Sequence, residues 1–102
     1  MVKVKICGLT NQADYNLACQ LGADYAGFVF YRKSLRFIEP ELARKLVRQA
    51  KYQAIKVGVF VNEQASIIRE IYDYVGLDIV QLQGDEEPDF CRQLGLPYWK
   101  AI

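Results

Sequence analysis

The sequence predicts an α/β protein in which strands alternate with helices and the strands form a parallel sheet. Two observations support this prediction. Apolar or alternating runs of strand length recur along the chain, and each of the first four precedes a stretch suited to a helix. Gly and Pro residues lie at the boundaries of these stretches. Short connections between such units imply right-handed crossovers between parallel strands.

The first unit begins with a strand over residues 2–7, where apolar and polar residues alternate. This alternation places Lys5 and Cys7 on the same face of the strand. The sequence Asn-x-x-Asp that follows resembles a capping box, and it starts a helix that runs from residue 11 through residue 21. Gly22 can end this helix in the left-handed conformation.

The second and third units each begin with an apolar run, at residues 26–31 and 55–61. Runs without alternation are typical of parallel strands that are buried on both faces. Between them, a helix is expected over residues 40–49, because Pro40 suits the first turn of a helix. After the second run, Asn62 can cap a helix over residues 65–75, and Gly76 can end it.

The last part of the chain contains a short strand at residues 79–82, a short helix at 88–94 and a fifth strand at 98–102. Three acidic residues, 85–87, precede the short helix. We interpret them as charges favoured by the helix dipole and not as a magnesium site, since nothing else in the sequence points to a metal. The length of 102 residues fits a single domain over residues 1–102.

Two architectures satisfy this pattern of elements. One is an open, flavodoxin-like sheet with helices on both sides, and the other is part of a (βα)8 TIM-type barrel, consisting of four βα units and a fifth strand. In both architectures, small-molecule chemistry collects beyond the carboxyl ends of the strands. The pattern of elements leaves both open.

The composition excludes several classes of function. The net charge is +1 and no nucleotide-binding motif is present, so we expect no nucleic-acid partner and no organic cofactor. The apolar runs are too short to span a membrane. The chain contains no histidine, which excludes Ser-His-Asp catalysis and histidine-ligated metal sites within it, and we expect no metal. Its three cysteines lack the spacing of a zinc site, which favours a reducing cytoplasm.

Two candidate functional residues lie at the expected carboxyl ends of neighbouring strands. Cys7 precedes a turn into a helix amino terminus, where exposed amide groups and the Lys5 ammonium would favour a thiolate. The loop after the second strand carries three cations, and it suits a small anionic ligand. Among these cations, Arg36 offers a planar fork that matches a carboxylate or phosphate, whereas Lys33 is a flexible point charge. Cys19 and Cys91 are interpreted as packing residues.

Four motifs at the ends of the first four strands together resemble the phosphoribosylanthranilate isomerase family. They are KICGLT at residues 5–10, AGFVFY at 26–31 with SLRFI at 34–38, VGVFVN at 57–62 and VQLQGD at 80–85. The resemblance spans essentially the whole chain. It implies the amino-terminal portion of a (βα)8 barrel, about the first four βα units and a fifth strand.

The resemblance further implies an Amadori rearrangement of N-(5-phosphoribosyl)anthranilate, a step of tryptophan biosynthesis that uses neither metal nor organic cofactor. In this family the cysteine matching Cys7 is the general base, and the arginine matching Arg36 holds the anthranilate carboxylate. Gln83 stands at a substrate-binding position where the family usually has histidine, and Leu35 stands where proline or a polar residue is common. The family's general acid and phosphate-binding loops belong to strands beyond residue 102, so we expect the isolated chain to be inactive.

Two hypotheses for the role of the chain follow. It is either part of an isomerase that needs a complementary carboxyl-terminal fragment, or a non-catalytic structural module that self-associates. In both cases the first and fifth strands are expected to be unpaired edges, and the face that lines a barrel is expected to be open to water. We therefore expect a homo-oligomer, with two copies enclosing that face, and marginal stability of the isolated chain.

Overall fold

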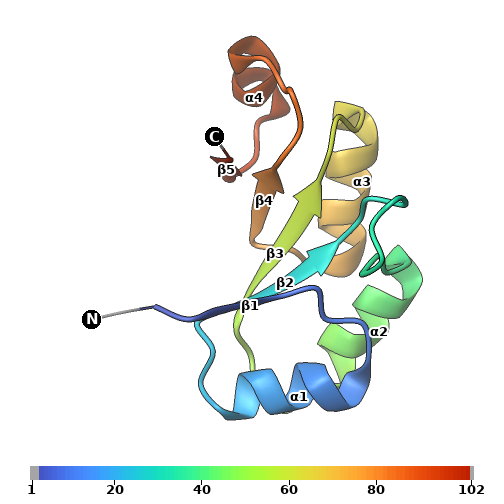
Figure 1. The fold of residues 1–102 in the computed structure, drawn as a ribbon, viewed down its shortest axis with the longest axis vertical. Helices are drawn as coiled ribbons and strands as arrows, with labels where there is room; N and C mark the ends of the chain where they lie inside the picture. The colour runs from blue at the N-terminus through green and yellow to red at the C-terminus, as the bar shows by residue number, and fades with distance from the viewer. Residues whose placement is uncertain (1–2, 102) are drawn as a thin grey trace.

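The computed structural model describes residues 3–101 and contains a parallel five-stranded sheet in the order β1-β2-β3-β4-β5 (Figure 1). The strands are β1 Lys5–Cys7, β2 Tyr25–Val29, β3 Ile55–Phe60, β4 Ile79–Leu82 and β5 Tyr98–Lys100. The helices between them are α1 Gln12–Gln20, α2 Pro40–Gln49, α3 Ala65–Val75 and α4 Pro88–Leu94. The predicted alternation of strands and helices is confirmed.

The predicted helix boundaries agree best with the structure where a proline or a glycine marks them. The helix expected after Pro40 and the helix expected before Gly76 have the predicted limits, and Gly22 has the left-handed conformation (φ +86°). The first three strands are shorter than predicted. β2 stops at Val29 because the chain then turns, and the amide of Ile38 returns to hydrogen-bond the Val29 carbonyl. Residues 2 and 102 of the predicted first and fifth strands lie outside the described residues.

The sequential strand order rules out the flavodoxin-like alternative, whose order would be 2-1-3-4-5. Each crossover moves one strand further in the same direction, so right-handed connections place every helix on the same face of the sheet. Successive helices contact one another along that face, as Figure 1 shows. The architecture is therefore (βα)4 plus a fifth strand, as in one half of a barrel.

The main core lies between this helix layer and the sheet, on what we call the helix face. Aromatic rings dominate it: Phe28 stacks on Tyr15 with ring centroids 5.4 Å apart, and Phe30 stacks on Phe60 at the same distance. The other large side chains that are fully buried come from strands and helices alike, and they are Leu46, Ile68, Val80, Leu82 and Leu94. Within residues 3–101, no charged residue belongs to this core.

The opposite face of the sheet, which we call the inner face, carries no helix from the described part of the chain. The strand register assigns it the following residues: Lys5, Cys7, Tyr25, Gly27, Val29, Ile55, Val57, Val59, Ile79, Gln81 and Trp99. Three of its valines are nonetheless buried, although they do not belong to the helix-face core: Val29, Val57 and Val59. The inner face therefore has a small buried cluster of its own.

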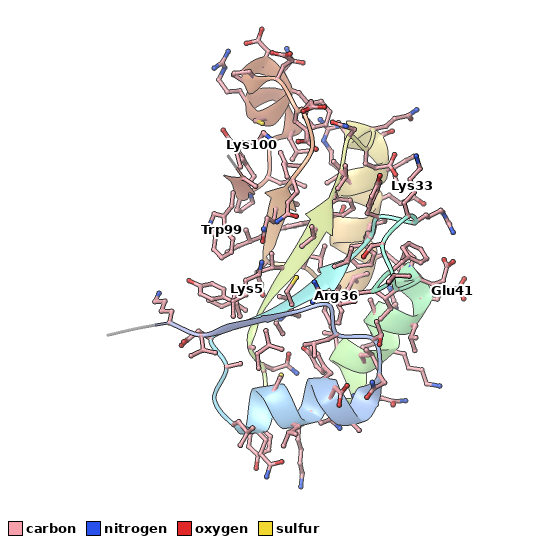
Figure 2. All side chains as sticks on the ribbon, viewed as in Figure 1. Lys5, Lys33, Arg36, Glu41, Trp99 and Lys100 are labelled. Carbon is pink, nitrogen blue, oxygen red and sulfur yellow. The ribbon has the colours of Figure 1, made fainter. Side chains whose placement is uncertain are left out.

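Contacts across the inner face explain this burial. The Lys5 ammonium on β1 hydrogen-bonds the Gln81 side chain on β4, and the Tyr25 ring on β2 meets the Trp99 ring on β5 edge-on at 5.1 Å. In a flat sheet, strands β1 and β4 would be about 14 Å apart. Because their side chains touch, the sheet is strongly curled, with Lys5 and Trp99 on the side away from α2 and α3 (Figure 2).

The inner face is thus only partly open to water, which corrects the expectation of a fully open face. Its valines are covered by the chain's own side chains, whereas Ile55 is 40% exposed and Trp99 is 37% exposed. The edges match the prediction, since within residues 3–101 β1 pairs only with β2 and β5 pairs only with β4. In the same part of the chain, no helix has the length and apolar character needed to cross a membrane.

Candidate active site

Cys7 is the last residue of β1 and lies on the inner face, at the carboxyl ends of the strands. Its register partner on β2 is Gly27, and a Cβ atom at that glycine would lie 3.1 Å from the Cys7 sulfur. Gly27 therefore leaves room for the thiol. Cys7 is half-buried, whereas Cys19 and Cys91 are buried in the helix-face core, so Cys7 is the accessible thiol of the three.

Arg36 reaches Cys7 because the loop after β2 folds back on itself. The Ser34 amide bonds the Tyr31 carbonyl at 3.0 Å, and the Arg36 amide donates to the Ser34 hydroxyl at 3.1 Å. The Arg36 guanidinium then donates from Nη1 to the Cys7 carbonyl at 3.3 Å. Figure 2 shows Arg36 beside the end of β1.

Gly8 makes this approach possible in two ways. Its φ of +81° lies in the left-handed region, which glycine adopts without strain. A Cβ atom at this position would also lie only 2.9 Å from the Nε and Nη1 atoms of Arg36. The turn after Cys7 thus provides a flat surface on which the guanidinium lies. The guanidinium therefore lies against the main chain of Cys7 and Gly8, at the carboxyl end of β1.

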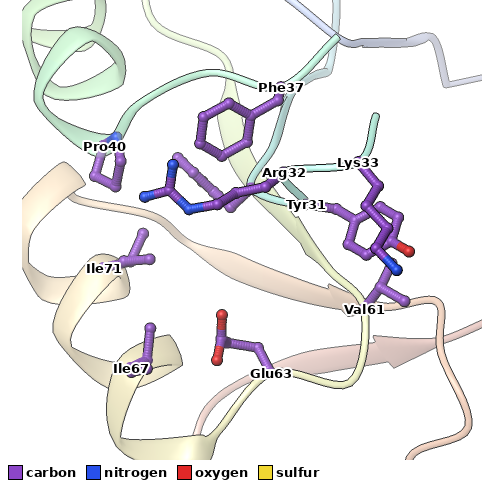
Figure 3. A pocket seen from close by; sticks show the side chains of 10 residues that line it. Tyr31, Arg32, Lys33, Phe37, Pro40, Val61, Glu63, Ile67 and Ile71 are labelled. Carbon is purple, nitrogen blue, oxygen red and sulfur yellow. The ribbon is translucent and has the colours of Figure 1, made fainter. Parts of the chain in front are cut away.

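The other two cations of the loop do not join this rim, which corrects the expectation of a three-cation anion site. Arg32 forms a salt bridge with Glu39 at 3.2 Å and lies 5.0 Å above the Phe37 ring. Arg32 and Lys33 line a separate hollow of about 380 Å³ between this loop and α3 (Figure 3). The turn at Ser34 separates them from Arg36, so only Arg36 faces Cys7.

Within residues 3–101, Gln83 and Lys5 form no side-chain hydrogen bond with Cys7 or Arg36. Gln83 follows β4, is exposed, and its side chain makes no hydrogen bond within residues 3–101. Its backbone amide is fixed by the Phe60 carbonyl at 3.0 Å. Lys5, which was expected to act on the thiol, directs its ammonium to Gln81 instead.

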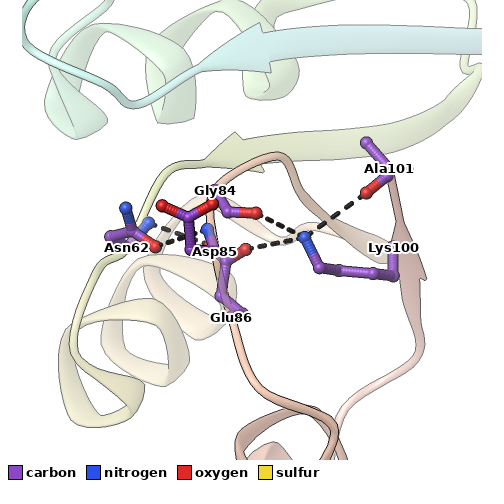
Figure 4. Close-up of polar contacts among 6 residues, drawn as sticks. All are labelled: Asn62, Gly84, Asp85, Glu86, Lys100 and Ala101. Atoms are coloured by element: carbon purple, nitrogen blue, oxygen red, sulfur yellow. Dashed lines mark hydrogen bonds and ion pairs between the residues drawn. The ribbon is translucent and has the colours of Figure 1, made fainter.

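A network that the sequence did not reveal ties the ends of β3, β4 and β5 together (Figure 4). The Asn62 side-chain oxygen accepts a hydrogen bond from the Asp85 backbone amide at 2.7 Å. The backbone amide of Asn62 donates to the Glu86 carboxylate at 2.9 Å. Lys100 forms a 3.1 Å ion pair with Glu86 and donates to the Gly84 carbonyl. This network positions the loops that follow the strands, next to Gln83.

Asn62 is therefore not the helix cap that the sequence predicted. The capping position of α3 is Gln64, which has no side-chain capping bond, while Asn62 adopts a left-handed conformation with φ of 51°. Asparagine tolerates this conformation better than most residues. Gly84 packs directly against it, since a Cβ atom there would lie 2.8 Å from the Asn62 amide nitrogen.

The interpretation of the acidic run as helix-dipole charges also needs correction at Glu86. Its side chain is only 2% exposed, and burial acts to raise the pKa of this carboxyl. Hydrogen bonds from the backbone amides of Asn62 and Glu86 and the Lys100 ammonium outweigh that effect and lower the pKa below its ordinary value. Glu86 therefore stays ionised as a structural anchor. Among the described residues, no group of three or more His, Cys, Asp or Glu side chains could hold a metal ion.

Comparisons with known proteins identify a family that fits this geometry. The family model described as N-(5'phosphoribosyl)anthranilate (PRA) isomerase matches residues 4–102. An N-(5'-phosphoribosyl)anthranilate isomerase from Pelobacter propionicus is 50% identical over 102 residues, which are 100% of this chain and 49% of the relative.

Two solved structures resemble the fold closely. The crystal structure of phosphoribosyl anthranilate isomerase from Thermotoga maritima has a TM-score of 0.95 at 44% identity, covering 100% of this chain and 51% of that chain. A phosphoribosyl anthranilate isomerase in complex with reduced 1-(o-carboxyphenylamino)-1-deoxyribulose 5-phosphate has the same TM-score and identity, with 54% of its chain covered.

The chain spans about half the length of the curated relatives it matches, and about half of these solved structures. The match to a (βα)8 barrel protein extends over every strand and helix described above, which confirms the partial barrel. The family model covers all but three of the 102 residues, from 4 to 102. This chain therefore belongs to the N-(5'-phosphoribosyl)anthranilate isomerase family.

Proposed function

We propose that this chain supplies one side of an isomerase active site that rearranges N-(5-phosphoribosyl)anthranilate to its open-chain 1-deoxyribulose product. The observation that carries the proposal is the meeting of Arg36 with Cys7 at the carboxyl ends of β1 and β2. A nucleophilic or basic thiol beside a planar cation suits a substrate that carries both an acidic C–H bond and a carboxylate.

In this role, the Cys7 thiolate removes the proton from the sugar carbon, and Arg36 holds the anthranilate carboxylate. Gln83 gives a further substrate contact from the end of β4, without the ability to titrate that a histidine would have. The reaction consists of proton transfers within one molecule, so it requires no cofactor. Support for the carboxylate contact comes from the solved relative that holds a carboxyphenylamino ligand.

The proposal requires a complementary part of the barrel. The general acid and the phosphate-binding loops of the family are expected on strands that follow the fifth, and the matched relatives are about twice as long as this chain. Residues 1–102 act here as one partial-barrel domain, and alone they have negligible isomerase activity. The three free cysteines fit a reducing compartment such as the cytoplasm.

A complementation experiment tests this function. The full chain is produced together with the second half of the Pelobacter propionicus relative, which begins where the match to this chain ends, and isomerase activity is measured. We expect activity from the pair only. Cys7→Ala should lower kcat by about 10²- to 10⁴-fold, which is the usual effect of losing a general base.

The matched control is Cys19→Ala, which removes a buried thiol far from the rim and should leave kcat within about threefold. Arg36→Gln should raise KM more than it lowers kcat, because Arg36 binds the substrate carboxylate in ground state and transition state alike. A soluble, tightly associated pair without activity would count against the proposed function.

A second candidate function is a self-associating structural module without catalysis. The observation in its favour is that β1 and β5 are free edges and that Tyr98 and Trp99 on β5 are more than one-third exposed. The Thermotoga maritima isomerase is described as dimeric, which makes a homo-oligomer reasonable for this family. Light scattering of the purified chain distinguishes the candidates, since a strictly monomeric species at micromolar concentration contradicts self-association.

A further inference from the structure

We propose that the inner face docks a polypeptide that brings a carboxylate to Lys5, and that a second copy of this chain is not its partner. This inference rests on the proposed function, because it takes the partner to be the complementary half of an isomerase barrel. It adds the chemistry by which the two halves recognise each other. The argument starts from the surroundings of one ammonium group.

Lys5 lies near the middle of the inner face with its charge only partly satisfied. Its side chain is half-buried, and its ammonium bonds to the neutral amide of Gln81 and lies 5.9 Å from the centroid of the Trp99 ring. Within residues 3–101, no carboxylate comes within salt-bridge distance of it. The remaining hydrogen-bonding capacity of this ammonium is available to water or to a partner.

Among residues 3–101, the inner face offers Lys5 no ion-pair partner. None of the five strands contains Asp or Glu, so every acidic group nearby belongs to a loop or a helix. The two acids at the amino ends of the strands already have partners: Asp24 accepts from the Val4 amide at 2.7 Å, and Asp78 forms a 3.2 Å ion pair with Lys56. Within residues 3–101, the inner face is therefore mostly apolar, and its positive charges are not compensated: that of Lys5, and that of the exposed Lys3 beside Tyr25.

Covering this face removes Lys5 from water, and the cost of doing so decides which partner fits. An ammonium buried without a counter-charge is destabilising by several kcal/mol, whereas a carboxylate with good geometry offsets most of that cost. A partner that covers the apolar cluster around Val57 must therefore also present Asp or Glu opposite Lys5. The free edges of β1 and β5 require that the same partner bring strands that pair with both of them.

A second copy of this chain does not meet these requirements. Two-fold pairing places the same residues on both sides of the interface. Two inner faces pressed together would enclose two Lys5 ammoniums and no strand carboxylate, so like charges would share an apolar space. This argument replaces the expectation that two copies enclose the inner face, and it leaves only contacts at the free edges for self-association.

A double-mutant cycle tests the proposal, with the second half of the Pelobacter propionicus relative as the probe. Trp99 is the only tryptophan of the chain and lies beside Lys5, so its fluorescence reports docking at the inner face. We expect Lys5→Met to weaken association at least tenfold and Lys5→Arg to preserve it within a few fold. Lys45→Met, an exposed lysine on α2, is the matched control and should change nothing.

The cycle then replaces each inward-facing Asp or Glu of the probe by Asn or Gln. One of these changes should weaken binding of the probe to the unmodified chain. The same change should weaken binding to Lys5→Met much less, because neither charge is then left unpaired. Circular dichroism of each variant verifies that the chain remains folded.

If Lys5→Met binds the probe as tightly as the unmodified chain, this inference is overturned while the proposed function stands. Failure of the two halves to associate at all would overturn both. A homodimer in which Trp99 fluorescence changes and Lys5 becomes protected from acetylation on self-association would likewise contradict the inference, since it would show that a second copy covers the inner face.

Discussion

The two faces of the sheet differ in how completely the chain's own side chains cover them. On the helix face, side chains from all four helices close over the strands and bury aromatic rings such as Phe28 and Phe60. On the inner face, three valines are buried without a helix above them, and long side chains such as Lys5 and Trp99 make contacts across the strands. The same backbone therefore supports one complete core and one incomplete one.

This difference separates the face that stabilises the fold from the face that carries the proposed site. The helix face holds the fold together, whereas Cys7 and Arg36 lie at the rim of the inner face. In the proposed function these two side chains must reach a ligand, which the less covered inner face allows. The following experiments measure how unequal the two faces are.

The largest expected effect is the loss of an aromatic ring from the helix face. Phe60 is fully buried and stacks on Phe30, so Phe60→Ala should lower the free energy of unfolding by about 3–5 kcal/mol. Trp99→Ala, which truncates a ring that is 37% exposed on the inner face, should cost clearly less. Urea unfolding followed by circular dichroism measures both, and equal losses would show that the faces are equivalent.

Two matched valine substitutions, one on each face, test the same difference in stability. Val80 on the helix face and Val57 on the inner face are both 0% exposed and both lie in strands. Val80→Ala should cost about 2 kcal/mol, because tightly packed neighbours cannot fill the cavity. Val57→Ala should cost about half as much, because the flexible Lys5 and Gln81 side chains can collapse onto it. A larger loss at Val57 would contradict this account.

The Glu86 network at the rim predicts a smaller, pH-dependent effect. The pKa of Glu86 is lowered on folding, so its stabilisation is present above the ordinary carboxyl value of 4.5 and is lost as the pH falls through the lower pKa of the folded chain. Glu86→Gln should lower the free energy of unfolding at pH 7 by about 1–2 kcal/mol. It should also flatten the decline in stability below pH 4.5. An unchanged acid profile in the variant would contradict the assigned role.

The smallest effect is expected at Tyr15, the one imperfect point of the helix-face core. Its hydroxyl is buried without a hydrogen-bond partner within residues 3–101. Burial, followed by the neighbouring Cys19, raises the pKa of Tyr15, so the group stays neutral. Tyr15→Phe removes an unsatisfied polar atom and should stabilise the chain by up to about 1 kcal/mol. A shift of the thermal midpoint to a lower temperature would contradict this.

The sequence predicted the elements well because the signals for them are local. The positions of α2, α3 and α4 follow from Pro40, Gly76 and Pro88, whose chemistry acts within one turn of the helix. The choice between an open sheet and a barrel segment required family motifs, since local periodicity does not determine strand order. Strand ends and motifs also predicted that Cys7 and Arg36 lie at neighbouring strand ends, and the structure adds the bond from Arg36 to the Cys7 carbonyl.

What the sequence missed depends on side chains that meet across several strands. Nothing local predicts that Lys5 turns to Gln81 on β4, because that contact exists only once the sheet has curled. The Glu86–Lys100 pair likewise joins residues 14 positions apart, and its one local signal is Gly84, which leaves space for Asn62. The sequence also did not predict that the loop folds back at Ser34. This turn separates Arg36 from Arg32 and Lys33, although all three cations lie close together in the sequence.

The most direct test of the central claim measures how Arg36 affects the Cys7 thiol in the isolated chain. Cys7 is the accessible thiol, so its alkylation can be followed by mass spectrometry with anionic iodoacetate and neutral iodoacetamide at low salt. We predict that Arg36→Gln lowers the ratio of the two rates about threefold, which is the effect of one unit charge about 6 Å away when water screens it. An unchanged ratio would show that the guanidinium and the thiol do not share one site.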